Sequence, residues 1–273
     1  MAIKPKPPLR KEPREREHYP LWSRVCEAIR ALPMHFRSET VIGGILATDI
    51  FTLNSALGAT IEEQVVAALN ALRPVWDPDK KYQTFGFVRQ TQAFPDVLLR
   101  KQLNGHEILL GIELKGWYML AKEGEPSFRF VANAAACADR DLIVVVPWVL
   151  SNVLAGSPVA YDVFIDLANY TAQQRNHYWQ YERDVKEGNK DINLATGATV
   201  YPAKSDKISD KAVYDPGGNF GRLARYGIME QFVKKTMETP LRGIPASQWL
   251  SFFRNAAKAA KKLQTAEPVH PAP

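Results

Sequence analysis

The sequence predicts an α/β protein in which a mixed sheet is flanked by helices, and two observations lead to this fold class. Between residues 60 and 148, segments with helical spacing of apolar residues alternate with short runs rich in β-branched, aromatic and leucine residues. The chain also has 273 residues, of which 46% are hydrophobic, enough for a sizeable core without a disulfide or a structural metal. The predicted order is α-β-β-β-α-β, followed by helical additions.

The helices before the sheet are predicted from stripes of apolar residues. One helix is expected over 18–32, ending near Pro33. A second is expected to begin at Thr60, whose hydroxyl can cap it, with Glu63 three residues later as in a capping box. Its apolar stripe ends at Pro74 and consists of Ile61, Val65, Leu69 and Leu72.

The remaining elements follow from composition and periodicity. Strands are predicted over 82–89, 94–101, 107–115 and 141–148, with a helix over 131–138 before the last of them. Further helices are predicted over 163–183, 223–237 and 247–263, with a loop-rich stretch over 188–220. We expect a flexible basic arm over 1–17, a single domain over 18–264 and a disordered tail over 265–273.

Charge and cysteine content narrow the class of protein. The net charge of +6 favours a polyanionic partner such as nucleic acid. Cys26 and Cys137 belong to no Cys-x-x-Cys pair, so zinc-ribbon and redox-motif functions have no support. The chain shows no signal peptide and no apolar run that could span a bilayer, so we expect a soluble, cytoplasmic protein without membrane contact.

The most informative stretch runs from Phe94 to Lys115. Asn104-Gly105 between two apolar runs is typical of a two-residue hairpin turn, and such a turn makes the numbers of facing residues add up to 209. Asp96 then faces Glu113, and Lys115 points to the same face because strand side chains alternate. The opposite face is apolar and carries Val97, Leu99, Leu110, Ile112 and Leu114.

Two facing carboxylates repel each other unless a cation lies between them. Together with the main-chain carbonyl of Leu114, Asp96 and Glu113 can hold a divalent cation, and Lys115 can orient a nucleophile or stabilise negative charge. This set is suited to phosphodiester hydrolysis. Taken singly, Glu113 and Lys115 also fit a surface ion pair on an edge strand, and Asp96 fits a turn residue.

Pro95-Asp96, sixteen intervening residues and Glu113-Leu114-Lys115 resemble the motif of the PD-(D/E)XK nucleases, which include type II restriction endonucleases. The element order over 58–148, the expected catalytic core, is similar to that of the family. The resemblance implies that Asp96 and Glu113 bind Mg²⁺ and that Lys115 helps the attacking water. Many members also place a Glu on the preceding helix, four residues after a Gly. Gly58 and Glu62 repeat this spacing, with Glu63 as the alternative.

We therefore expect a magnesium-dependent type II restriction enzyme that cuts double-stranded DNA at a specific, palindromic sequence. The alternatives are a structure-specific repair or recombination nuclease and a non-catalytic DNA-binding protein. The absence of an ATP-binding motif argues against a helicase-coupled nuclease, and we expect no nucleotide cofactor.

The region 149–264 is expected to supply DNA recognition and dimerisation. A single catalytic set per chain favours a homodimer that cuts both strands, paired through the aromatic helix from Tyr170 to Tyr181 or through the closing helix with Trp249, Phe252 and Phe253. The aromatic residues are equally suited to core packing, and the loop charges to solvent. The candidate DNA contacts are Arg175, Asn176, His177, Lys204, Lys207, Arg222 and Arg225.

Overall fold

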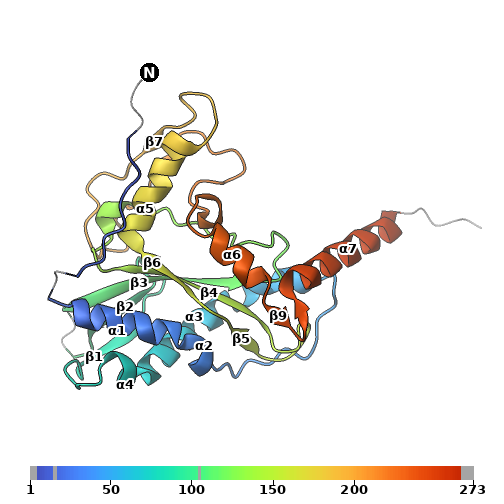
Figure 1. Ribbon diagram of the computed structural model, residues 1–273, viewed down its shortest axis with the longest axis horizontal. Helices are drawn as coiled ribbons and strands as arrows, with labels where there is room; N and C mark the ends of the chain where they lie inside the picture. The colour runs from blue at the N-terminus through green and yellow to red at the C-terminus, as the bar shows by residue number, and fades with distance from the viewer. Residues whose placement is uncertain (1–4, 15–16, 104–105, 266–273) are drawn as a thin grey trace, which may run out of the picture.

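The computed structural model describes residues 5–14, 17–103 and 106–265 and shows an α/β protein with a curled mixed sheet flanked by helices (Figure 1). The α-helices are α1 (Tyr19–Arg30), α2 (Leu32–His35), α3 (Leu53–Ala71), α4 (Arg73–Trp76), α5 (Ala168–His177), α6 (Glu230–Met237) and α7 (Ala246–Thr265). Short 3-10 helices are η1 (Ile50–Thr52), η2 (Ala134–Ala136) and η4 (Leu223–Arg225), and η3 (Tyr178–Glu182) is a π-helix. Within these residues, no helix is both long enough and apolar enough to cross a membrane.

The main sheet contains six of the strands in the described part of the chain. These strands are β1 (Phe85–Arg89), β2 (Val97–Lys101), β3 (Ile108–Tyr118), β4 (Leu142–Leu150), β5 (Pro158–Ala160) and β6 (Phe164–Leu167). Strands β1, β2 and β3 pair antiparallel, β4 joins β3 in parallel, and β5 and β6 both pair antiparallel with β4. Two-residue ladders join β7 (Ile192–Asn193) to β8 (Lys211–Ala212), and β9 (Pro240–Leu241) to β10 (Ile244–Pro245).

The register of the β2–β3 hairpin agrees with the prediction over the part that carries the site. Val97 faces Ile112 and Leu99 faces Leu110, as expected. Arg100, however, faces Ile108, which leaves Leu109 as the extra residue of a β-bulge. The predicted Asn104-Gly105 turn lies outside the described residues.

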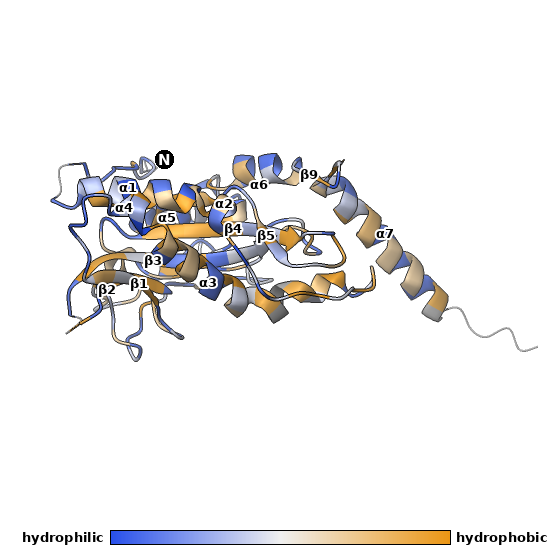
Figure 2. Ribbon diagram, turned by 90° about the horizontal axis from the view of Figure 1, so that it is seen from below, coloured by the Kyte–Doolittle hydropathy of each residue, from blue (hydrophilic) through white to orange (hydrophobic). Residues whose placement is uncertain are grey.

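The two faces of this hairpin meet different parts of the protein. The even-numbered residues of β3 face α3, because a side chain at Gly116 would contact Ile61. The odd-numbered residues face the other way, where Trp117 packs against Phe232 of α6. Figure 2 shows α3 on one side of the sheet and α6 on the other.

The start of α3 corrects the prediction of a capped helix beginning at Thr60. The helix begins at Leu53, so Thr60 and Glu63 lie inside it rather than at its N-terminus. Leu53 and Leu57 extend the predicted apolar stripe by two turns, and their burial outweighs the cost of Gly58 in a helix interior. The stripe itself is confirmed, since Ile61, Val65, Leu69 and Leu72 are all buried.

Two other helix predictions are wrong in part. Of 131–138, only Ala134–Ala136 forms a 3-10 turn, because the flanking backbone pairs with another segment: Asn133 donates its N–H to the carbonyl of Ile208. The predicted helix over 163–183 begins only at Ala168, since 164–167 pairs with β4 as β6. Likewise, 223–237 contains a 3-10 turn and the shorter helix α6.

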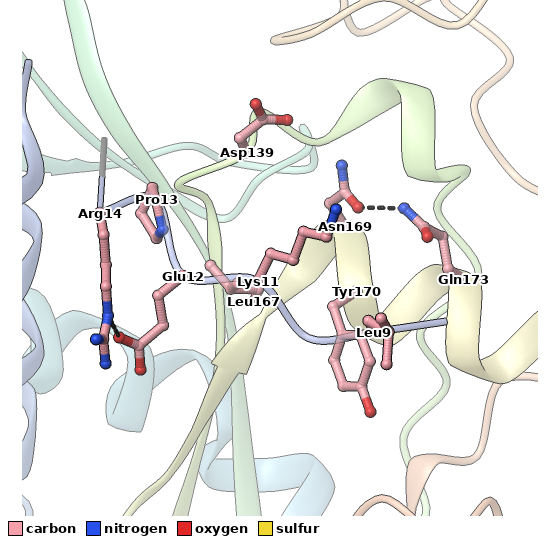
Figure 3. Close-up of a pocket in the computed structure, with 10 residues that line it drawn as sticks. All are labelled: Leu9, Lys11, Glu12, Pro13, Arg14, Asp139, Leu167, Asn169, Tyr170 and Gln173. Carbon is pink, nitrogen blue, oxygen red and sulfur yellow. Dashed lines mark hydrogen bonds and ion pairs between the residues drawn. The ribbon is translucent and has the colours of Figure 1, made fainter. Parts of the chain in front are cut away.

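Residues 5–14 of the N-terminal arm lie along β6 and α5 (Figure 1). Arg10 Nε donates to Asp166 Oδ1 at 2.7 Å, and the carbonyl oxygen of Pro5 lies 3.0 Å from His177 Nε2. A cavity of about 850 Å³ remains between the arm and α5, and Figure 3 shows residues from both sides around it. Its walls mix both charges with amides, including Lys11, Asp139 and Gln173.

Candidate active site

Asp96, Glu113 and Lys115 meet at the end of the β2–β3 hairpin, as the sequence predicts. Lys115 Nζ lies 2.6 Å from Glu113 Oε1 and 3.0 Å from Asp96 Oδ2. The ammonium group therefore bridges the two carboxylates. Their side chains retain exposed fractions of 11% for Glu113 and 23% for Asp96, so solvent reaches the site.

The backbone of β3 helps to position Asp96. The N–H of Leu114 donates to Asp96 Oδ2 at 2.9 Å, so this carboxylate occupies the place of a strand partner just before β2 begins. The N–H and C=O of one strand residue point to the same edge, so the carbonyl of Leu114 is directed to this side as well. The Leu114 carbonyl thus lies on the edge of β3 that Asp96 contacts.

Burial and charge act together on the titratable groups. Burial raises the pKa of Glu113 to about 7, and the charge of Lys115 only partly opposes this effect. Burial by itself would lower the pKa of Lys115, but the attraction of Glu113 and Asp96 is stronger and raises it above its ordinary value. The lysine is therefore cationic at neutral pH, and the carboxylate beside it gains a proton more readily than a free glutamate.

A cavity of about 290 Å³ opens next to the two carboxylates. One wall is formed by 92–94 and the other by 202–208, and Lys204 Nζ donates to Gln92 Oε1 across the rim at 3.2 Å. The lining residues are Gln92, Ala93, Phe94, Asp96, Glu113, Pro202, Ala203, Lys204, Asp206 and Ile208.

Glu62 is not beside this group, contrary to expectation. Its carboxylate accepts hydrogen bonds from Arg89 at 2.8 and 3.1 Å. Arg89 faces Val97 in the β1–β2 ladder and so shares the face that α3 covers, whereas Glu113 points to the opposite face. Glu63, the alternative, is exposed on α3.

The three predicted DNA contacts on α5 form hydrogen bonds within the protein. Arg175 is fully buried, and its guanidinium donates to Asp210 and to the carbonyls of Phe130 and Ala132. Asn176 also donates to Asp210, and His177 is buried below the arm. Arg175 therefore exposes no donor to a ligand, which corrects its assignment as a DNA contact.

The predicted loop contacts are more accessible. Lys204 and Lys207 are exposed on the wall of the cavity or next to it. Arg225 is exposed but forms an ion pair with Glu125 at 2.5 Å, and half-buried Arg222 donates to the carbonyl of Gly218. Of these four residues, only Lys204 lines the cavity that contains Asp96 and Glu113.

The candidate dimer surfaces differ in how much of them is exposed. In the aromatic helix, Trp179 is buried against Phe220, and Tyr178 packs on Tyr226. Helix α7 projects from the body (Figures 1 and 2) and leaves Phe252 57% exposed, while Phe253 is buried. Helix α7 is thus the better of the two candidate surfaces, and dimerisation stays a prediction.

Sequence reasoning missed three residues around the site: Gln92, Asp141 and Tyr201. Gln92 and Tyr201 adopt positive φ angles of 55° and 53°, which no sequence motif indicates for these residue types. The Tyr201 hydroxyl donates to Asp141 Oδ1 across sixty positions of sequence, a contact that only the folded chain reveals.

Comparison with known proteins adds no assignment, since no family model, no curated protein and no solved structure matches the chain.

Proposed function

We propose that this protein is a magnesium-dependent endonuclease for double-stranded DNA, with a PD-(D/E)XK core like that of type II restriction enzymes. One observation carries the proposal: Lys115 Nζ lies within 3.0 Å of both Asp96 and Glu113, beside a cavity that contains the two carboxylates. The antiparallel β1–β3 unit followed by parallel β4 is consistent with it. The missing helix between β3 and β4 is a departure from the element order expected for the family.

The donor set suits a hard divalent cation. Asp96, Glu113 and the Leu114 carbonyl offer oxygen ligands only, which Mg²⁺ prefers, and they leave room for waters and a phosphate oxygen. No group of three His, Cys, Asp or Glu side chains that could hold a metal ion occurs in the described ranges, so waters and the carbonyl would complete the coordination. When bound, Mg²⁺ would polarise the phosphodiester and lower the pKa of the attacking water.

The protein's own groups would supply the remaining chemistry. Asp96 is held by the Leu114 N–H and Glu113 by burial, so both carboxylates are ordered before a ligand arrives. Lys115 remains cationic and can donate a hydrogen bond to the attacking water or to a phosphate oxygen as negative charge develops. Lys204 offers a second positive charge at the cavity rim, where a phosphate backbone would approach.

The test is digestion of supercoiled plasmid DNA with the purified full chain and Mg²⁺, followed by sequencing of the ends. We expect linear products with ends at one sequence, and no products from the Asp96→Asn protein. Cutting only at branched substrates would instead identify a structure-specific nuclease. Duplex binding without cleavage under all metal conditions would overturn the proposed hydrolysis.

A further inference from the structure

The wall formed by 202–208 covers the carboxylate cavity but has few attachments to the body. Ala203 to Lys207 are exposed, and Ala203 and Asp206 bond mainly to each other. At the far end, the Ile208 carbonyl accepts from Asn133 at 2.7 Å. Between the ends, Lys204 donates to Gln92 at 3.2 Å, and at the near end the hydroxyl of Tyr201 donates to Asp141 at 2.9 Å.

Asp141 is a buried anchor that also contacts the strand carrying Glu113. Its Oδ1 accepts from the Gly111 N–H at 2.7 Å as well as from Tyr201, and its Oδ2 accepts from Ala138 at 2.7 Å. Gly111 lies two residues before Glu113 and on the same face. One carboxylate oxygen thus joins the wall of the cavity to β3.

Gly111 shows how closely these parts are packed. A Cβ atom there would lie 2.5 Å from Pro95 and 3.0 Å from Asp141, so no larger residue fits without movement. Pro95 directly precedes Asp96. The elements that carry Asp96, Glu113 and the wall therefore meet at this glycine.

Backbone conformation adds an independent observation. Tyr201 has φ of 53°, a left-handed conformation that residues with a side chain seldom adopt and that occurs preferentially at functional sites. Gln92, which accepts from Lys204 on the opposite wall, has φ of 55°. One wall of the cavity thus contains a residue in an unfavourable backbone conformation, and the 202–208 wall directly follows another.

We propose that Tyr201 and Asp141 are positioning residues, which hold the 202–208 wall against the strand that carries Glu113. In this position, Lys204 of the wall can contact the DNA substrate. This inference rests on the proposed function. Asp96, Glu113 and Lys115 are joined to one another independently of Tyr201. The wall therefore acts on DNA binding rather than on the hydrolytic step.

The variant Tyr201→Phe removes only the hydroxyl and tests this role. We expect the KM for duplex DNA to rise about fivefold, as for the loss of one hydrogen bond, while kcat stays close to the wild-type value. Trypsin should also cut after Lys204 and Lys207 several times faster than in the wild type. Tyr226→Phe is the matched control, because its buried hydroxyl donates to Asn219 and accepts from Gly221 away from the cavity.

A folded Tyr201→Phe protein with wild-type KM, or with wild-type cutting after Lys204 and Lys207, would overturn the inference while leaving the proposed nuclease standing. A wild-type protein that cleaves no DNA would overturn the proposed function and the substrate role of the wall. The trypsin comparison would still decide whether Tyr201 holds the wall. An equal rise in KM for Tyr226→Phe would show a general effect of lost stability and also count against the inference.

Discussion

The guanidinium of Arg175 donates to the carboxylate of Asp210 at 2.6 Å, and neither side chain is exposed to solvent. Burial lowers the pKa of Arg175 to about 10, although the negative charge of Asp210 acts to raise it. Asp210 also accepts from Asn133 and from the backbone of Ala195, so the pair joins α5 to 195–210 and fixes the segment that leads to the cavity wall.

We expect Arg175→Met to lower the free energy of unfolding by about 3–5 kcal/mol, because it leaves the Asp210 carboxylate buried without its main counter-charge. Urea denaturation measures this change. The control is Arg24→Met, which breaks an exposed pair with Asp79 at 2.6 Å and should cost less than about 1 kcal/mol. Equal losses in the two variants would contradict a structural role for Arg175.

Glu62→Gln and Asp96→Asn should differ sharply in cleavage assays. Glu62 pairs with Arg89 on the α3 side of the sheet, so its replacement should reduce cleavage by less than about threefold, within the range of a weakened partly exposed ion pair. Asp96→Asn removes a charge that Lys115 contacts and should abolish cleavage. Loss of cleavage in both variants would show that Glu62 is needed for catalysis after all.

The stability of the metal-free protein should depend on Glu113. Its folded pKa of about 7 lies above the ordinary value of 4.5, so the unfolded chain releases this proton at lower pH than the folded one. Ionisation of Glu113 therefore destabilises the folded protein. This loss of stability is small below about pH 4.5, grows between about pH 4.5 and pH 7, and is complete above about pH 7. Glu113→Gln should therefore gain a few degrees in Tm over the wild type at pH 8 in EDTA, where about 1 kcal/mol corresponds to about 2–4 °C, and gain little at pH 4.5.

Mg²⁺ should reduce the difference in Tm between Glu113→Gln and the wild type. Because it supplies positive charge beside Glu113, adding it at pH 8 should raise the Tm of the wild type more than that of Glu113→Gln. Thermal scans with and without the ion measure this. An identical rise in both proteins would place the ion elsewhere.

The choice of divalent cation should distinguish DNA binding from DNA cleavage. We expect Mg²⁺ and Mn²⁺ to support cleavage, while Ca²⁺ supports DNA binding only, because it takes more ligands with looser geometry and does not position the water. Gel-shift and cleavage assays on the same duplex give the two readouts. Undiminished cleavage in excess chelator would exclude the proposed mechanism.

The site itself was predictable because its three side chains lie within one hairpin, where alternation and register decide which residues face each other. The cavity walls were not, since Lys204 and Gln92 meet across 112 positions of sequence. The predicted helix over 131–138 failed for a related reason. Its alanines favour a helix, but tertiary pairing of Asn133 with Ile208 outweighs this local preference.

The buried position of Arg175 also could not be predicted from the sequence. An arginine next to Asn176 and His177 has the composition of a nucleic-acid contact, and only the buried position of Asp210 shows that its charge is used inside the protein. Glu62 has the spacing expected from the resemblance, yet Arg89 on β1 fixes it on the other face.

The bulge at Leu109 divides the hairpin into two segments whose registers differ by one residue. Because a bulge accommodates one extra residue, we expect a residue gained or lost between Arg100 and Ile108 to alter the tip and not the pairing of Val97 with Ile112. The tip could therefore diverge in length and sequence among descendants of this chain, while the facing of Asp96 and Glu113 is inherited unchanged.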